Sequence, residues 1–264
     1  MKTHDVKGLL DDKEFLNIHC KRKHKEEYEV SDYSMKVIHS HYPYLKNDYM
    51  FISSQEHRRQ MSSPGAWLQR KGNGNWVDVV ADVLTSEKFM EKKLAKSQVL
   101  KKYRRVYHSI GNILPIPEGG NDVWGRGDCY TKKLQAIRQW IEKKNKNMNL
   151  LQSQENNDVI ARLDLGLYLS KAAKGRNYPC FKEQQIIRYW LQNEVLFSSW
   201  EDYVVQNYLQ DFVNTKEDYK VKELQLTESG IEELIKMIIC RSYRILSNGQ
   251  EMPEDYLNSV ITEI

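Results

Sequence analysis

The sequence has few cysteines and prolines and no long apolar run. Four cysteines stand far apart among 264 residues, and no Cys-x-x-Cys pair suggests a zinc ribbon or a dithiol redox site, so free thiols are expected. No apolar run approaches the roughly 20 residues that cross a bilayer, and residues 1–7 lack the apolar segment of a signal peptide. We therefore expect a cytoplasmic protein with no membrane partner.

Common catalytic motifs are also missing. The chain has neither a Gly-x-x-x-x-Gly-Lys-Ser/Thr phosphate loop nor a Gly-x-Ser-x-Gly elbow, and Gly72-Asn73-Gly74 is too short for a dinucleotide-binding fingerprint. The net charge of +4 is only mildly basic, which is compatible with a nucleic-acid partner without indicating one. The 16 tyrosines and 6 tryptophans are typical of a folded chain with a core rather than a disordered one.

Apolar residues that recur at three- and four-residue steps predict a mainly helical, α+β fold with a helical C-terminal half. We expect helices between residues 76 and 107, along 134–141, 186–196 and 203–213, and from the N-cap Thr227 to a stop at Asn248-Gly249.

Strands are expected only in the N-terminal part. Residues 48–54 read as a short strand within a small strand-containing region at about 28–55, and 53–75 are expected to be rich in loops. The chain 1–264 is predicted to form a single domain. The alternative is a mixed α/β part over 1–150 and a helical part over 151–264, with an exposed linker at 152–158.

Six of the seven histidines and a basic run lie in residues 1–60. The run Lys-Arg-Lys-His-Lys at 21–25 could contact phosphates, although such runs more often form a solvated helix face. His39 and His41 would share one face of a strand. Without an evident third ligand, this pair is not expected to bind a metal.

Residues 108–128 hold two of the six prolines and five of the thirteen glycines. They predict an irregular, rigid loop that either positions a site or only connects helices. Its apolar side chains should pack on the core, and they are Ile110, Ile113, Leu114, Ile116 and Trp124.

The segment His108-Ser109-Ile110-Gly111-Asn112, with Pro115 and Pro117 after it, resembles a segment of a bacterial family that has no assigned activity. Its Gly-Asn pair, with Asn121 downstream and Glu56-His57 upstream, also resembles HNH-type nucleases related to modification-dependent restriction enzymes. The chain departs from that nuclease pattern at Arg58, which replaces an apolar residue, and at Gln60, which replaces a proline.

The nuclease resemblance implies a protein that acts on nucleic acid with a divalent metal, and phage defence is the role expected from it. It assigns three roles: a histidine base that deprotonates water, an asparagine that orients the base, and groups that hold metal and phosphate. The residues for these roles are His57 or His108 as base, Asn112 or Asn121 as its orienter, Asp128 as a metal ligand and Arg126 as a phosphate ligand.

A structural alternative stays open for the same segment. In it, His108 packs beside the loop and Asn112 caps its turn, because asparagine side chains readily bond nearby backbone groups. The chain would then be a non-catalytic helical interaction protein with a protein partner.

Overall fold

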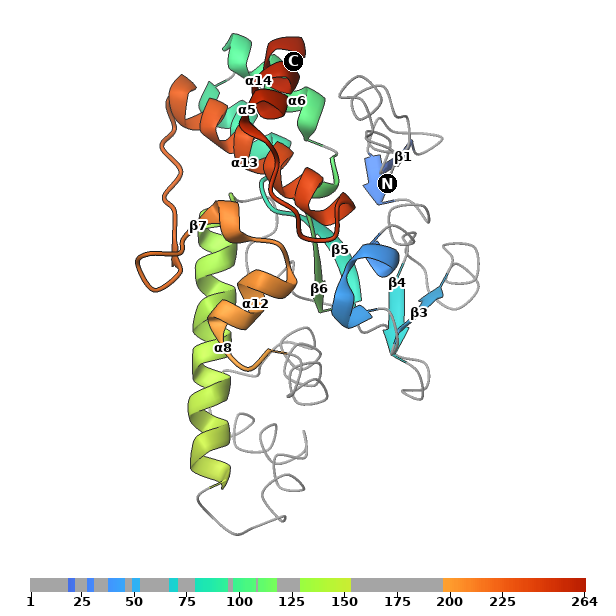
Figure 1. Cartoon of the computed structure of the whole chain (residues 1–264), viewed down its shortest axis with the longest axis vertical. Coiled ribbons are helices and arrows are strands. Elements are labelled where there is room, and N and C mark those ends of the chain that lie inside the picture. The colour runs from blue at the N-terminus through green and yellow to red at the C-terminus, as the bar shows by residue number, and fades with distance from the viewer. Residues whose placement is uncertain are drawn as a thin grey trace.

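The computed structural model describes residues 19–21, 28–30, 38–45, 49–52, 67–70, 79–94, 97–107, 109–117, 129–152 and 197–264. Figure 1 shows their arrangement. Helices account for most of these residues, and the strands are few and short. The predicted class, mainly α within an α+β fold with a helical C-terminal part, is confirmed.

A four-stranded antiparallel sheet lies at the centre of the described residues (Figure 1). Its strands follow one another in chain order, and they are β3 (Tyr49–Ile52), β4 (Trp67–Arg70), β5 (Val79–Val83) and β6 (Ile113–Pro117). Strands β5 and β6 pair along their whole length. A separate antiparallel pair consists of β1 (His19–Lys21) and β2 (Tyr28–Val30).

Three strands of the sheet correct the sequence-based expectation. Strand β4 lies in the region expected to be loops, β5 lies in the region expected to be helical, and β6 lies in the segment 108–128, expected to be an irregular loop. Three valines in β5 fit a half-buried strand as well as they fit a helix, because a short apolar run does not distinguish the two. The strands therefore extend well beyond residues 28–55.

The helical prediction holds after β5. Helix α5 (Glu87–Leu94) is followed by α6 (Gln98–Val106), whose N-cap Ser97 accepts a hydrogen bond from the Val99 backbone. The two helices are joined by a short connection, so they can pack against each other as a hairpin.

Helix α13 (Glu228–Leu246) begins and ends where the sequence predicts. The Thr227 side chain accepts a hydrogen bond from the Gly230 backbone, as an N-cap residue does. After the helix, Asn248 and Gly249 adopt φ angles of 56° and 100°, the left-handed geometry that ends helices. Both predicted signals are confirmed.

The stripe expected at 203–213 is only partly helical. Helix α12 (Trp200–Gln206) ends early because Tyr208 takes a left-handed φ of 54°, and a 3-10 turn η3 (Gln210–Phe212) follows. The apolar side chains of the stripe are nevertheless buried as a core requires. The stripe expected at 186–196 lies outside the described residues.

The remaining elements surround these helices. Helix α8 (Tyr130–Gln152) runs alongside α12, a small hairpin joins β7 (Val213–Asn214) to β8 (Lys220–Val221), and α14 (Glu254–Glu263) lies beside α13 (Figure 1). None of the described helices has both the length and the apolar character needed to cross a bilayer.

Helix α13 is the centre of the core. It packs against α6, η3, α14 and the 3-10 turn η2 (Ile110–Asn112), and its buried residues are apolar except for Arg241, Ser242 and Arg244. One cluster of buried side chains extends from Ile38 through the sheet to Val260 in α14. The N-terminal and C-terminal halves therefore share buried contacts.

The histidine pair near the N-terminus is placed differently from the expectation. Residues 38–41 form a helical turn, so the prediction that His39 and His41 share a strand face is wrong. The Nε2 atom of His39 lies 2.9 Å from the Tyr49 carbonyl oxygen. Of the basic run at 21–25, only Lys21, in β1, lies within the described residues.

Candidate functional site

One of the six residues assigned to a nuclease site, Asn112, lies in the part of the chain that the structure describes. The other five lie outside it, so their roles stay predictions: His57, His108, Asn121, Arg126 and Asp128. Within the described ranges, no group of three or more His, Cys, Asp or Glu side chains could hold a metal ion. The described residues alone therefore do not fit a metal centre.

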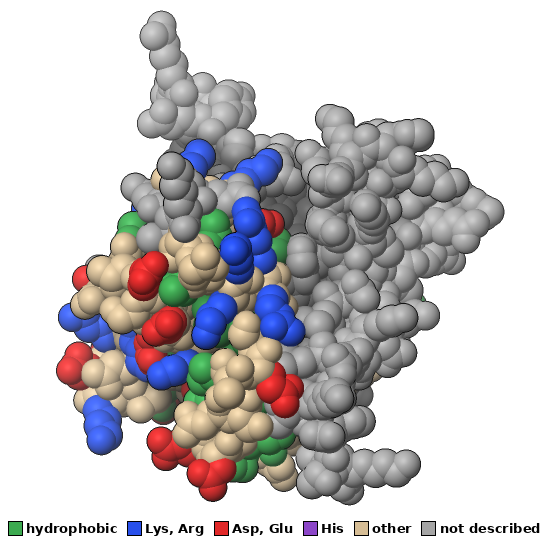
Figure 2. All heavy atoms as spheres, turned by 90° about the horizontal axis from the view of Figure 1, so that it is seen from above, with side chains coloured by type: hydrophobic (Ala, Val, Ile, Leu, Met, Phe, Trp, Pro, Cys, Tyr) green, Lys and Arg blue, Asp and Glu red, His purple; other side chains and the backbone are tan. Residues whose placement is uncertain are grey.

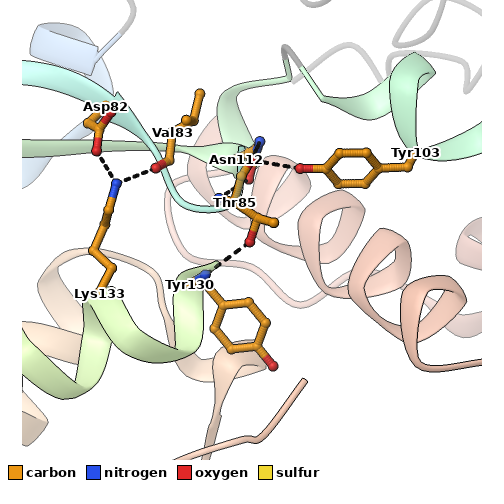
Figure 3. A network of polar contacts seen from close by, with 7 residues as sticks. All are labelled: Asp82, Val83, Thr85, Tyr103, Asn112, Tyr130 and Lys133. Carbon is orange, nitrogen blue, oxygen red and sulfur yellow. Dashed lines mark hydrogen bonds and ion pairs between the residues drawn. The ribbon is translucent and has the colours of Figure 1, made fainter. Parts of the chain in front are cut away.

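The Asn112 side chain is completely buried and bonded to backbone groups (Figure 3). Its Oδ1 accepts a hydrogen bond of 3.1 Å from the Thr85 backbone N–H. Its Nδ2 donates to the Thr85 carbonyl at 3.1 Å and to the Tyr107 carbonyl at 2.9 Å. Both amide hydrogens are thus engaged, and the carboxamide ties η2 to the segment after β5 and to the end of α6.

Thr85 extends this network in two directions (Figure 3). Its carbonyl also accepts a 2.6 Å hydrogen bond from the Tyr103 hydroxyl, and its Oγ1 accepts one of 3.0 Å from the Tyr130 N–H at the start of α8. Burial raises the pKa of Tyr103 well above its ordinary value, so this hydroxyl remains a donor throughout the neutral range. The network joins β5, α6 and α8 around Asn112.

A buried ion pair lies next to this network (Figure 3). Lys133, in the first turns of α8, is 1% exposed and pairs with Asp82 of β5. Its ammonium group also donates to the Val83 carbonyl at 2.5 Å. A lysine buried this deeply requires such partners, because an unpaired ammonium is very costly to remove from water. The pair fixes α8 against the sheet.

The first part of the 108–128 segment is packed on the core, as predicted, but it forms the turn η2 and strand β6 instead of an irregular loop. Its apolar side chains at 110, 113, 114 and 116 are at most 1% exposed, whereas Trp124 lies outside the described residues. The Gly111 N–H donates to the Ser242 hydroxyl at 2.9 Å, and a Cβ at Gly111 would overlap the Ile238 carbonyl of α13. Only glycine allows this close approach.

Arg241 of α13, which the sequence does not single out, is fully buried beneath this segment. Its guanidinium donates to the carbonyls of Gly111 at 2.7 Å and Ile113 at 2.8 Å, to the Asn207 carbonyl, and to the Tyr42 hydroxyl. All five of its N–H groups therefore have an acceptor. Arg241 has a structural part in holding the segment.

Helices α5 and α6 carry a second candidate site on the outside of the molecule. We call it the basic face and define it as the exposed residues Lys88, Lys92, Lys101 and Arg105. The α6 sequence holds four basic residues and no acidic one. Figure 2 shows this end of the molecule, where Lys and Arg side chains gather in the upper middle of the view, with Asp and Glu side chains to the left of them, among them and along the lower edge.

Some of the cations on these two helices already have partners. Arg104 forms a 2.6 Å ion pair with Glu87, and Arg105 donates to the backbone oxygens of Glu263 at 2.9 Å and of Ile264 at 3.3 Å. Among the side chains that the structure describes, which do not include that of Glu91 in α5, no carboxylate forms an ion pair with the three lysines of the basic face. Exposed lysines on two adjacent helices can bind a polyanion.

Comparison with protein-family models, with curated proteins and with solved structures gives no match to this chain. Two features of the described residues bear on function, the Asn112 network and the basic face.

Proposed function

We propose that this protein binds nucleic acid through the basic face and acts on it as a metal-dependent nuclease. The observation that carries the proposal is that exposed cations of two adjacent helices, Lys88 and Lys92 of α5 and Lys101 and Arg105 of α6, lie at one end of the molecule. Lysine and arginine side chains neutralise phosphates and release their counterions, which gives affinity for DNA or RNA without sequence preference.

The catalytic half of this proposal rests on the resemblance to HNH nucleases. Because the Asn112 carboxamide is engaged by backbone groups, Asn121 is the better candidate to orient a histidine base. His57 or His108 would accept the proton of a water molecule, and Arg126 would hold a phosphate. The metal would be held by Asp128 with further ligands from outside the described residues. Cleavage of phage nucleic acid is the biological role that fits this activity.

The second candidate function, a non-catalytic helical interaction protein, has its own support. Asn112 makes the backbone contacts that a structural residue makes, and Gly111 is required by close packing rather than by a ligand. If the whole 108–128 segment has this role, the motif stabilises the fold and the chain has no activity to lose.

A cleavage assay separates the two candidates. The intact protein is incubated with single- and double-stranded DNA and RNA, with Mg²⁺, with Mn²⁺ and with a chelator. The nuclease proposal expects metal-dependent cleavage that His57→Ala or His108→Ala lowers by about 10²–10⁴-fold, the range for loss of a general base, at an unchanged melting temperature. His4→Ala, a histidine outside the motif, serves as the matched control and should cleave normally.

Two results contradict the catalytic half of the proposal. One is the absence of cleavage by the wild type with either metal. The other is cleavage that neither His57→Ala nor His108→Ala changes. A lower melting temperature of His108→Ala, without any activity in the wild type, favours the interaction protein.

A further inference from the structure

We infer that the basic face binds the two phosphate backbones of a double-stranded nucleic acid, an inference that rests on the proposed function. The cations of this face form two parallel rows. Lys88 and Lys92 lie one helical turn apart on α5, and Lys101 and Arg105 lie one turn apart on α6. Residues four apart on a helix share one face and are separated by about 6 Å along its axis.

The two helices that carry these rows run in opposite directions. Glu87 begins α5 and Arg104 lies near the end of α6, and their 2.6 Å ion pair brings these opposite ends together. Helices that pack side by side have axes about 8–10 Å apart, which sets the spacing between the rows.

This spacing suits the strands of a duplex. The grooves of B-form DNA are about 6 Å and 12 Å wide, so two rows of cations about 8–10 Å apart can contact the phosphates on both sides of one groove. A single strand offers one line of phosphates and would occupy only one row. A duplex therefore gains more from this arrangement than a single strand does.

The aromatic side chains of α5 and α6 also favour a duplex over a single strand. Proteins that bind single strands stack the bases on exposed aromatic rings. In the described parts of α5 and α6, Tyr103 is buried, and Phe89 and the adjacent Tyr107 are partly buried against the core. The face thus offers charge for backbones and no exposed aromatic ring for unstacked bases.

One edge of the face meets the end of α14. Arg105 donates to the backbone oxygens of Glu263 at 2.9 Å and of Ile264 at 3.3 Å. The lysines Lys88, Lys92 and Lys101, which have no such contact among the described side chains, are therefore the cations that we expect to contribute most to duplex binding.

The test measures binding of the full chain to a fluorescent duplex and to its separate strands by anisotropy, with a chelator present. For four phosphate contacts on a duplex, the slope of log affinity against log salt is about −3.6, which is about 150-fold weaker binding for a fourfold rise in salt. Removing two contacts with Lys92→Gln and Lys101→Gln should halve this slope, leaving about a 12-fold change.

The matched control is Lys216→Gln, which removes one exposed lysine from the β7–β8 turn, away from α5 and α6. It should bind like the wild type. The melting temperatures of all variants should stay close to that of the wild type, because each change removes only an exposed side chain.

The outcomes distinguish the two levels of the inference. Duplex affinity at least tenfold above single-strand affinity, lowered only by the α5 and α6 variants, supports the inference. Single strands bound equally well or better, with the same sensitivity to these variants, overturn the duplex assignment and leave the proposed function intact. Absence of binding to any form, or binding that the variants do not change, overturns the basic face and the proposed function together.

Discussion

Replacing Asn112 with alanine should strongly destabilise the fold. The change removes three hydrogen bonds within the core, two to Thr85 and one to Tyr107. The Thr85 carbonyl keeps the Tyr103 hydroxyl, whereas the buried Thr85 N–H loses its acceptor. A buried donor without a partner costs about 1–3 kcal/mol, and the other lost bonds add about 1 kcal/mol, so we expect a loss of about 2–4 kcal/mol.

Urea unfolding, followed by circular dichroism, measures this loss as a shift of the midpoint at an unchanged slope. Asn112→Asp is the matched variant, because it keeps one oxygen in place but turns a second oxygen toward two carbonyls. Burial and these carbonyls should raise the pKa of the new carboxyl group in the folded state. The free energy of unfolding of Asn112→Asp, compared with that of the wild type at the same pH, should therefore be highest at pH values below the ordinary Asp pKa. It should fall as the pH rises toward 7.

The opposite result would refute this reasoning. If Asn112→Ala unfolds within about 0.5 kcal/mol of the wild type, the network of Figure 3 does not stabilise the fold, because changes of that size are typical of exposed sites.

Three further substitutions test the packing around the same region. Gly111→Ala should lower the stability measured by thermal unfolding by at least about 3 kcal/mol, because the new Cβ would overlap the α13 backbone and the Ser242 hydroxyl. A melting temperature equal to that of the wild type would contradict this close approach. Asp82→Ala should lower the free energy of unfolding in urea by about 3–5 kcal/mol, because it leaves Lys133 buried without its carboxylate partner. Adding Lys133→Met should recover part of that stability. Equal losses in the single and the double variant would argue against a charge effect. Burial raises the pKa of Tyr42 from 10.0 to about 12, so folding stability should decrease as the pH rises above 10. Tyr42→Phe should weaken that decrease. An identical pH profile of stability in the variant would show that ionisation of Tyr42 does not cause it.

The parts of the fold that could be predicted are those whose signals are local. The Thr227 cap and the Asn248-Gly249 stop act within a few residues of the helix end that they define. The burial of Ile110 and Ile113 could be predicted for a similar reason, since apolar side chains this numerous must leave water.

The parts that could not be predicted depend on distant partners. Arg241 bonds residues 34 to 199 positions earlier in the chain, and no local pattern distinguishes it from an exposed arginine in α13. The sequence predicts a helix at β5 because its apolar spacing fits a helix and a strand equally well. Pairing with β6, about 30 residues later, makes this segment a strand.

The candidate sites show the same division. The Gly-Asn motif identifies Asn112 in the sequence. Its hydrogen-bond partner Thr85 lies 27 residues away and belongs to no motif. The four-residue spacing within each row of the basic face is visible in the sequence. The antiparallel packing that places the two rows together is not, because it depends on how α5 and α6 meet in the fold.

Lysine footprinting tests the central claim, that nucleic acid binds to the basic face, most directly. The intact protein is acetylated briefly with and without a saturating DNA duplex, and modification at each lysine is quantified by mass spectrometry. We predict that the duplex protects Lys88, Lys92 and Lys101 while Lys216 and Lys220 on the β7–β8 hairpin react as before. Equal reactivity of the three α5 and α6 lysines with and without the duplex, or protection confined to the hairpin lysines, would contradict the account.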